Sequence, residues 1–320
     1  MLIAGVKPPG WFPRFDRYHP SPKTIPRGRT FHVFHRLARF SKTIQTVAGM
    51  RLYDAHNHLQ DERFAGRQAA LLESCQQVGV ARMVVNGSSE ADWPAVLALA
   101  RAHPEVWPSF GYHPWSIHER SPDWLSNLTR CLDAWPSAVG EIGLDRWKPG
   151  LAYAGQEEVF LAQLELAAAR KLPVSIHCLQ AWGRLYDLLK TRPRLERGFL
   201  LHSYGGPREM VRPLAELGAY FSLPGYFAHE RKHRQRETFR QVPRERLLLE
   251  TDAPDQNLPD ARNRFPLSDP ETGRPLNHPG NLAAVYAFAA ELLEESLEDL
   301  AAQVEVNFLR LFGGLARGPE

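Results

Sequence analysis

Two histidines, His56 and His58, close a short strand-type segment and are separated by a single residue. Because side chains alternate along a strand, both imidazoles project from the same face and are placed to bind one metal ion. Such pairs also arise by chance in a chain of this length, and a plain surface pair is the alternative interpretation. The pair indicates a metal site only if further ligands join it.

Four more residues with metal-binding side chains each follow a short apolar segment, namely Glu141, His177, His202 and Asp252. Glu141 stands between glycines, which let another backbone approach closely. Taken singly, each residue has a structural explanation, either a buried histidine with a satisfied ring or an aspartate that caps a turn. Cys178 is next to His177 but points to the other side of the expected strand, so we exclude it as a ligand.

The segments that carry these residues belong to an alternating pattern. Strand-type segments are expected at residues 51–56, 82–86, 106–112, 138–141, 174–177, 198–202, 219–223 and 246–250. Longer segments between them have helical spacing, as at 156–171. Eight such βα units over about 260 residues predict an α/β fold, a (β/α)8 TIM barrel.

The carboxyl ends of barrel strands converge on one cup, where the active sites of such barrels lie. This cup would gather six candidate ligands, His56, His58, Glu141, His177, His202 and Asp252. Six ligands exceed the need of one tetrahedral ion, so we expect two divalent metal ions per chain, bridged by Glu141 and a water molecule. Nitrogen and oxygen ligands without a thiolate favour Zn, Mn, Fe, Co or Ni, with Mg a further candidate, over a calcium site.

The motifs around these residues resemble those of the TatD-type metal-dependent hydrolases, also called TatD deoxyribonucleases, which are amidohydrolase-like TIM barrels. They stand here as Asp-Ala-His-Asn-His at 54–58, Gly-Tyr-His-Pro-Trp at 111–115, Gly-Glu-Ile-Gly-Leu-Asp at 140–145, Ile-His-Cys at 176–178, Leu-His-Ser-Tyr-Gly-Gly at 201–206, Leu-Glu-Thr-Asp-Ala-Pro at 249–254 and a final helix at 306–313. The resemblance covers about residues 50 to 314. It implies phosphodiester substrates and two ion positions, the first surrounded by His56, His58, Glu141 and Asp252, the second by Glu141, His177 and His202.

Three places depart from the family pattern and bear on the substrate rather than on the ions. Leu-Gln-Ala-Trp at 179–182 stands where the family usually has an arginine or another polar residue before an acidic one. Leu-Asp-Arg-Trp at 144–147 replaces the more usual aromatic residue directly after the aspartate. Asn-His-Pro at 277–279 stands for the family's Asn-Glu-Pro, and the loop 255–275 before it is somewhat long.

Ligand chemistry also suggests a mechanism. Two cations lower the pKa of a bridging water from about 15.7 toward about 7, which makes it the expected nucleophile. Asp252 is the candidate general base, and Glu141 is the second catalytic residue. On the substrate side, His113 is a candidate for gripping a phosphate or protonating the leaving oxygen, and a turn residue fixed by Pro114 is an equally good interpretation. Asp145 is a candidate for orienting a metal-bound histidine.

A basic segment, Glu-Arg-Lys-His-Arg-Gln-Arg at 230–236, follows the seventh expected strand, where many barrels bind phosphate. Tyr226, Phe227 and Trp115 offer rings on which bases can stack. A solvated helix face is the alternative for most of these charges. Because the catalytic region is mildly acidic, single strands or ends of nucleic acid are the expected substrate rather than duplex.

The sequence therefore predicts a metal-dependent hydrolase of ester bonds, foremost a deoxyribonuclease or other phosphodiesterase. Related barrels use the same ions for acyl chemistry, so hydrolysis of carboxylic esters, lactones or amides is the alternative. A non-catalytic barrel that holds metal or a partner is a third interpretation, which a bridging acid beside a candidate base disfavours. The sequence shows no sign of an obligate protein partner.

Charge is unevenly distributed along the 320 residues, which hold 39 basic and 36 acidic side chains. The first 50 residues hold nine Lys or Arg against one acid, together with six prolines, so we interpret residues 1–49 as a poorly ordered extension before a hydrolase domain at 50–320. A start assigned too early, an organelle-targeting peptide and a basic arm for nucleic acid explain it, in that order of preference. Three scattered cysteines favour a reducing compartment and no apolar segment is long enough to span a membrane, so a cytoplasmic location is expected.

Overall fold

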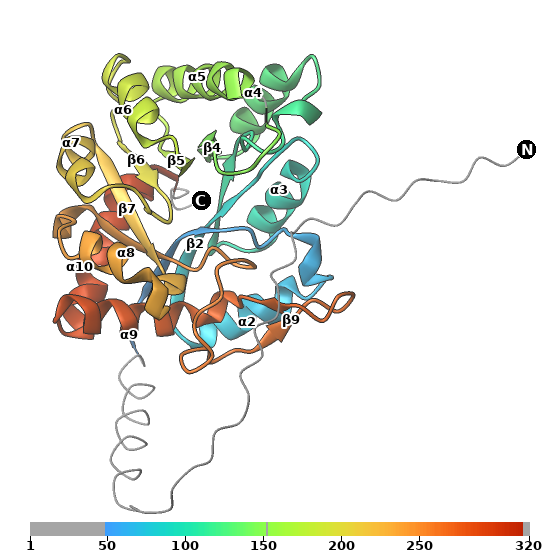
Figure 1. The fold of residues 1–320 in the computed structure, drawn as a ribbon. Coiled ribbons are helices and arrows are strands. Elements are labelled where there is room, and N and C mark those ends of the chain that lie inside the picture. The colour runs from blue at the N-terminus through green and yellow to red at the C-terminus, as the bar shows by residue number, and fades with distance from the viewer. Residues whose placement is uncertain (1–48, 152, 316–320) are drawn as a thin grey trace, which may run out of the picture. The chain divides into compact units, whose positions relative to one another are not determined.

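In the computed structural model, which describes residues 49–151 and 153–315, eight parallel strands form one sheet in chain order (Figure 1). The strands are β1 (Leu52–Asn57), β2 (Val80–Asn86), β3 (Val106–Phe110), β4 (Ala138–Asp145), β5 (Val174–Leu179), β6 (Phe199–Leu201), β7 (Ala219–Pro224) and β8 (Leu247–Glu250). This order, with helices between the strands, confirms the predicted (β/α)8 TIM barrel. The predicted extension lies outside the described residues except for Gly49, as do residues 316–320 of the predicted hydrolase domain.

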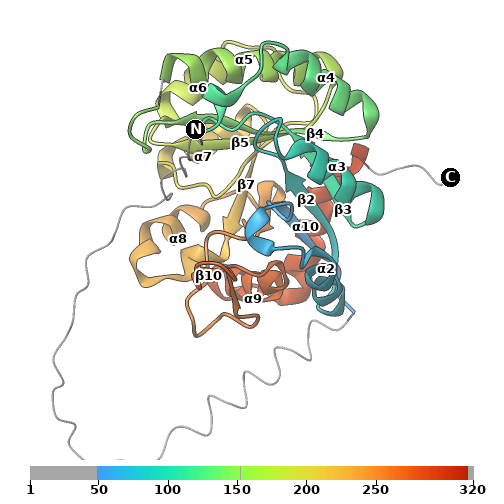
Figure 2. The same ribbon diagram turned by 90° about the vertical axis from the view of Figure 1, so that its right-hand side faces the viewer.

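Helices cover the outer side of the strands, as Figures 1 and 2 show. The α-helices of the described residues are α2 (Gln68–Gln77), α3 (Trp93–Ala102), α4 (Trp124–Ala134), α5 (Tyr153–Arg170), α6 (Trp182–Lys190), α7 (Val211–Glu216), α8 (His233–Phe239), α9 (Leu282–Leu293) and α10 (Leu297–Phe312). The helical spacing at 156–171 corresponds to α5. In the described part of the chain, none of the helices combines the length and apolar character that crossing a bilayer requires.

Helix α10 shows how local sequence sets an element. The hydroxyl of Ser296 accepts a hydrogen bond of 3.0 Å from the backbone N–H of Asp299, which satisfies one of the donors left open at a helix start. Leu300, Val304 and Phe308 then recur every four residues and are fully buried. Burying a side chain of this kind contributes about 1.5–3 kcal/mol each, so the stripe fixes the helix against the strands.

Hydrogen bonds between β1 and the residues that follow β8 connect the two edges of the sheet at the carboxyl end of the barrel. The Asp54 carboxylate accepts from the hydroxyl of Thr251 at 2.6 Å and from its backbone N–H at 3.0 Å. One residue further along, the N–H of Asp252 donates to the carbonyl oxygen of His56 at 3.0 Å. The closure therefore brings the residue that follows β8 directly beside the end of β1.

Strand β4 extends beyond the predicted 138–141 to Asp145, because its backbone packs unusually close to β5. Gly143 pairs with His177 in the parallel register and has φ of +154°. A Cβ atom at Gly143 would lie 1.9 Å from the carbonyl oxygen of His177, so only glycine fits. Glu141 consequently lies within β4 rather than at its end, and Asp145 faces the end of β5.

Candidate active site

Glu141 lies at the centre of a cluster of imidazoles. Its Oε2 atom is 3.3 Å from Nε2 of His56 and 3.2 Å from Nε2 of His58. Its Oε1 atom is 2.8 Å from Nε2 of His202 and 3.1 Å from Nδ1 of His177. One carboxylate therefore presents a separate oxygen to each of two histidine pairs, one at the end of β1 and one at the ends of β5 and β6.

Asp252, which follows β8, borders the first of these pairs. Its Oδ1 atom lies 3.7 Å from Nε2 of both His56 and His58, and its Oδ2 atom accepts a hydrogen bond of 2.6 Å from the Gln256 amide. The backbone of Asp252 has φ of +52°, a left-handed conformation that is uncommon for a residue with a side chain. The structure thus brings all six predicted ligand side chains into one cluster around Glu141.

Carboxylates support the second histidine pair. Nε2 of His177 is 2.9 Å from Oδ2 of Asp145, which leaves Nδ1 to face Glu141. A carboxylate bonded to the second ring nitrogen in this way fixes the tautomer and the orientation of an imidazole that binds a metal. Nδ1 of His202 is buried, lies 3.8 Å from Oε1 of Glu250 and has no hydrogen-bond partner among the described residues. Asp145 therefore lies where the sequence interpretation expected an orienting carboxylate.

Neutral groups support the first pair. Nδ1 of His58 is 2.8 Å from the backbone carbonyl oxygen of Asn86, an acceptor only, so this nitrogen carries the proton. In the neutral ring the Nε2 lone pair of His58 faces Glu141 and would be available to an ion, whereas in the protonated ring Nε2 donates to that carboxylate. Nδ1 of His56 is 2.9 Å from the hydroxyl of Ser175, which reaches it from β5, four strands away around the barrel.

His113 joins the cluster as the other tautomer of a neutral imidazole, with its proton on Nε2. Its Nε2 atom is 3.3 Å from Oε1 of Glu141, while its Nδ1 atom accepts a hydrogen bond of 3.2 Å from the backbone N–H of Trp115. In a neutral imidazole whose Nδ1 accepts, the proton is on Nε2. The Nε2 atom of His113 is therefore a donor toward the cluster and has no lone pair to offer an ion, which suits a substrate contact better than a ligand.

The charges of the cluster depend on one another. Burial would raise the pKa of Glu141, but the surrounding imidazoles, His202 foremost, hold it well below its usual value. Burial lowers the pKa of His56 to about 3. Burial acts in the same direction on His58, yet its contact with Glu141 outweighs burial and raises the pKa of His58 to about 9. At neutral pH an anionic carboxylate thus faces a protonated His58, whose proton an entering cation would displace.

The donor set fits two divalent ions. Three groups of side chains have ligand atoms within 4.8 Å of one another, namely His56 with His58 and Glu141, His56 with His202 and Asp252, and His113 with Glu141 and His177. Imidazole nitrogen and carboxylate oxygen are the ligands that borderline divalent ions accept, and no cysteine of the described residues belongs to these groups. The ring of His202 stacks on that of His56 with 4.0 Å between centroids, so the ion that His202 serves stays a prediction.

The sequence interpretation missed two supporting residues that a regular pattern marks. Ser175 precedes His177 by two residues within β5, the spacing that places side chains on one face of a strand, and Glu250, the last residue of β8, precedes Asp252 by two. Glu250 is fully buried and accepts hydrogen bonds from the hydroxyls of Ser203 and Ser222. A polar residue two positions before a candidate ligand, at the end of an apolar segment or within it, could therefore have identified these supporting side chains.

Two of the sequence features have structural roles. In the Asn-His-Pro motif, Nδ1 of His278 accepts a hydrogen bond of 2.9 Å from the N–H of Gly280 and caps the short 3-10 turn Pro279–Asn281. In the basic segment, the guanidinium of Arg236 donates to the carbonyl oxygens of Phe227 and His229 at 2.9 and 2.6 Å. These contacts bind both side chains to the chain's own backbone rather than orient them toward a substrate.

Other cations of the basic segment lie over an aromatic ring after β7. Arg231 donates to the hydroxyl of Tyr226 at 2.8 Å, and Nζ of Lys232 lies 4.7 Å from the centre of the Tyr226 ring. Tyr226 is partly exposed, so its ring and the two cations form an accessible group at the carboxyl end of β7. The phosphate and base contacts predicted for this loop stay a prediction.

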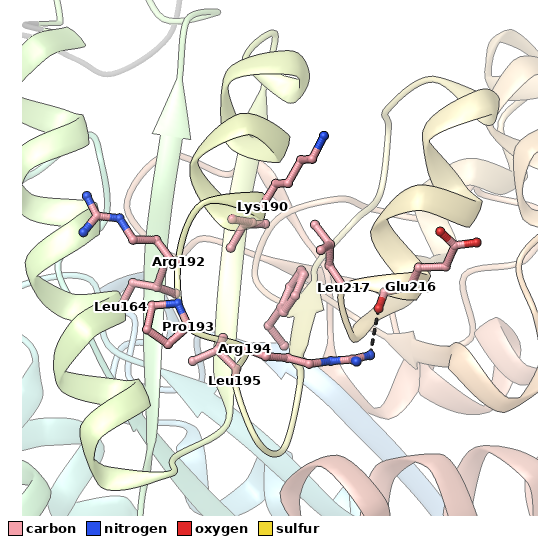
Figure 3. A pocket seen from close by; sticks show the side chains of 10 residues that line it. Leu164, Lys190, Arg192, Pro193, Arg194, Leu195, Glu216 and Leu217 are labelled. Atoms are coloured by element: carbon pink, nitrogen blue, oxygen red, sulfur yellow. Dashed lines mark hydrogen bonds between the residues drawn. The ribbon is translucent and has the colours of Figure 1, made fainter.

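A cavity of about 220 Å³ lies at the opposite end of the barrel, where β6 begins (Figure 3). Its apolar lining includes Leu164, Leu195 and Phe199. Arg194 reaches across it to the backbone carbonyl oxygen of Glu216 at 2.7 Å. None of the described histidines lines this cavity, so the chemistry of the cluster has no counterpart there.

Comparison with known proteins gives the same family at the level of sequence. The sequence model of the family described as TatD-related DNase matches residues 53–313. The metal-dependent hydrolase YjjV of Escherichia coli K12 is 31% identical over 265 residues, which cover 82% of this chain and 98% of that protein. The 3'-5' ssDNA/RNA exonuclease TatD of Erwinia tasmaniensis is 32% identical over 266 residues, which cover 82% of this chain and 99% of that protein.

Solved structures agree with the sequence matches. The crystal structure of Escherichia coli YjjV superposes with a TM-score of 0.74 at 31% identity, over 82% of this chain and 98% of that one. A TatD family hydrolase of Entamoeba histolytica shares the fold, with a TM-score of 0.72 at 18% identity over 82% of this chain and 98% of that one. Its barrel, its histidine cluster and these matches place the chain in the TatD-related DNase family of metal-dependent hydrolases.

Proposed function

We propose that this chain is a divalent-metal-dependent phosphodiesterase that hydrolyses single-stranded nucleic acid, DNA foremost. The observation that carries the proposal is the position of Glu141, with one oxygen toward His56 and His58 and the other toward His177 and His202. These side chains would hold two ions on the two sides of one carboxylate, and two-ion sites are common among phosphodiesterases. The relatives named as 3'-5' ssDNA/RNA exonucleases support the same substrate class.

The roles of the chain's own side chains follow from their contacts. Bound divalent ions supply an activated water and neutralise charge that develops on the phosphoryl oxygens. Burial raises the pKa of Asp252, which places this carboxylate near the neutral range where a general base works well. His113, with its proton on Nε2, is placed to donate to a phosphoryl or leaving oxygen. Asp145 holds His177 in place, and Glu250 places a negative charge 3.8 Å behind Nδ1 of His202.

Cationic side chains at the mouth, meaning the loops around the cluster at the carboxyl end of the barrel, favour a phosphate ester over a carboxylic ester. The Tyr226 ring with Arg231 and Lys232 offers both a stacking surface and positive charge, which a nucleic acid strand uses and a small neutral ester does not. Strand β7, which leads to this group, is four strands from β3 in either direction around the barrel. A strand bound there would pass over the cluster toward the loop after β3.

The test compares substrates on one preparation of the full chain. After removal of metal with a chelator and addition of Mn²⁺ or Mg²⁺, we expect release of nucleotides from a single-stranded oligonucleotide and no turnover of aryl esters or lactones. Glu141→Gln should abolish this release, whereas Glu165→Gln, at an exposed residue of α5, should leave it unchanged. Ester or lactone turnover without oligonucleotide cleavage would instead establish the acyl alternative.

A further inference from the structure

The loop after β4 carries a cation that the sequence interpretation did not use. Nζ of Lys148 lies 4.4 Å from the centre of the Trp115 ring, within the range of a cation–π contact. The Trp115 ring centre is in turn 5.1 Å from that of His113 and 6.1 Å from that of His177. The ammonium group of Lys148 is therefore separated from the histidine cluster by the width of one indole.

A single carboxylate fixes this geometry. Oδ1 of Asp145 accepts from the backbone N–H groups of Trp147 at 2.7 Å and of Lys148 at 2.9 Å. Its Oδ2 atom accepts from the indole N–H of Trp115 at 2.7 Å and lies 2.9 Å from Nε2 of His177. The loop that carries Lys148, the indole beneath its side chain and one ring of the cluster are thus held to the same residue.

The charge balance of the cluster suggests a role for Lys148. The carboxylates in or beside the cluster are Glu141, Asp145, Glu250 and Asp252. With all four ionised, their negative charges would offset the positive charge of two divalent ions, and the loaded cluster would then present little net positive charge to an approaching phosphodiester. Attraction of a polyanion must then come from side chains around the cluster, and Lys148 is a cation held beside it on the β3 and β4 side.

We propose that Lys148, supported by the Trp115 ring, binds a phosphate of the substrate strand adjacent to the one that is cleaved. The inference rests on the proposed function and adds a specific contact to it. With Tyr226, Arg231 and Lys232 after β7, the Lys148 and Trp115 pair gives the mouth a cationic aromatic group on each side of the cluster. The preferred substrate is consequently a strand with several phosphates rather than a single phosphate ester.

The experiment replaces Lys148 with Met, which keeps the alkyl stem on the indole and removes the charge. The matched control is Lys190→Met, at an exposed lysine of α6 beside the cavity at the other end of the barrel (Figure 3). Binding of a fluorescein-labelled oligothymidylate of about 12 nucleotides is measured by anisotropy against NaCl concentration. An Asp252→Asn background with Mn²⁺ present keeps the strand intact, and steady-state cleavage is measured with Asp252 restored.

Lys148→Met should raise Kd and KM about tenfold, which corresponds to one charge-assisted phosphate contact. It should also reduce the slope of log K against log salt by about 0.7, the value for one phosphate of a single strand. The value of kcat should stay within about twofold, because an adjacent phosphate binds equally in the ground and transition states. Lys148→Arg should restore most of the affinity, and Lys190→Met should match the parent chain.

The outcomes separate the inference from the function it rests on. Cleavage by the parent chain together with equal Kd and salt slope for Lys148→Met and Lys190→Met would overturn the inference alone. A parent chain that neither binds nor cleaves the strand would overturn both. Thermal unfolding is recorded for every variant, and a fall in kcat at unchanged KM in Lys148→Met would show a positioning effect on the cluster and contradict a phosphate contact.

Discussion

The two histidine pairs on either side of Glu141 receive their negative charge in different ways. His56 and His58 have neutral supports, a hydroxyl and a backbone carbonyl, but a carboxylate, Asp252, lies directly beside their Nε2 atoms. The second pair has carboxylates behind its rings, Asp145 and Glu250, and only the shared Glu141 in front. Apart from the shared Glu141, one carboxylate therefore contacts the first pair directly, whereas two carboxylates act on the second pair from behind its imidazoles.

This difference shows which carboxylate is available for proton transfer. Asp145 accepts hydrogen bonds from Trp115, Trp147 and Lys148, and Glu250 accepts them from two serine hydroxyls, so their oxygens are committed. Asp252 has one amide donor on Oδ2, and its Oδ1 atom faces the cluster. These contacts support the proposal that Asp252 transfers the proton and that the two carboxylates behind the second pair orient or charge its rings.

The largest effect is expected from Glu141→Gln, which removes the one group common to both sides. The variant should retain less than one divalent ion per chain and show no measurable cleavage, because an amide presents only one oxygen and no charge. Metal analysis after gel filtration, with oligonucleotide digestion on the same sample, measures both. Retention of two ions would show that the pairs do not depend on a common bridge.

Asp252→Asn should separate chemistry from metal binding. Loss of a general base lowers kcat by about 10²- to 10⁴-fold, while the two histidine pairs and Glu141 remain to hold the ions. Single-turnover cleavage and metal content are the measurements. If cleavage and metal content fell to the same extent, Asp252 would act mainly as a metal ligand. The two histidine pairs would then not differ in how their carboxylates are used.

The comparison also marks the limit of what the sequence could predict. Alternation along strands and convergence of strand ends were enough to predict the barrel and to bring His56, Glu141 and Asp252 together. Contacts that depend on the relative positions of several strands could not be predicted from the local sequence pattern. Glu250 approaches His202 only because β8 and β6 flank β7, and Lys148 lies on Trp115 only because Asp145 binds both segments.

The extension of β4 was unpredictable for a related reason. The predicted end at Glu141 follows from its charge, which ordinarily marks the edge of a buried strand. In the structure the strand continues because Gly143, which lacks a side chain, lets the backbone of His177 pack directly against it. This close packing can be predicted only when the neighbouring strand is known. Local pattern therefore gave the correct strand and an end four residues too early.

Asp145→Asn tests the carboxylate support of the second pair. Loss of a carboxylate behind a metal-binding imidazole lowers metal affinity or activity by about 10- to 100-fold. Titration with Mn²⁺ should show one weakened position and one unchanged position, because His56 and His58 do not contact Asp145. Equal weakening of both positions would mean that the two sides share their charge through Glu141.

The smallest effect is expected from Ser175→Ala, which removes the neutral support of His56. A neutral hydrogen bond contributes about 0.5–1.5 kcal/mol, so affinity for one ion should fall about tenfold at most. Glu250→Gln provides the internal comparison, since it removes charge behind His202 without removing bulk. If Ser175→Ala weakened metal binding as much as Asp145→Asn does, orientation of the rings rather than the charge behind them would control the affinity. The contrast between the two pairs would then be one of geometry alone.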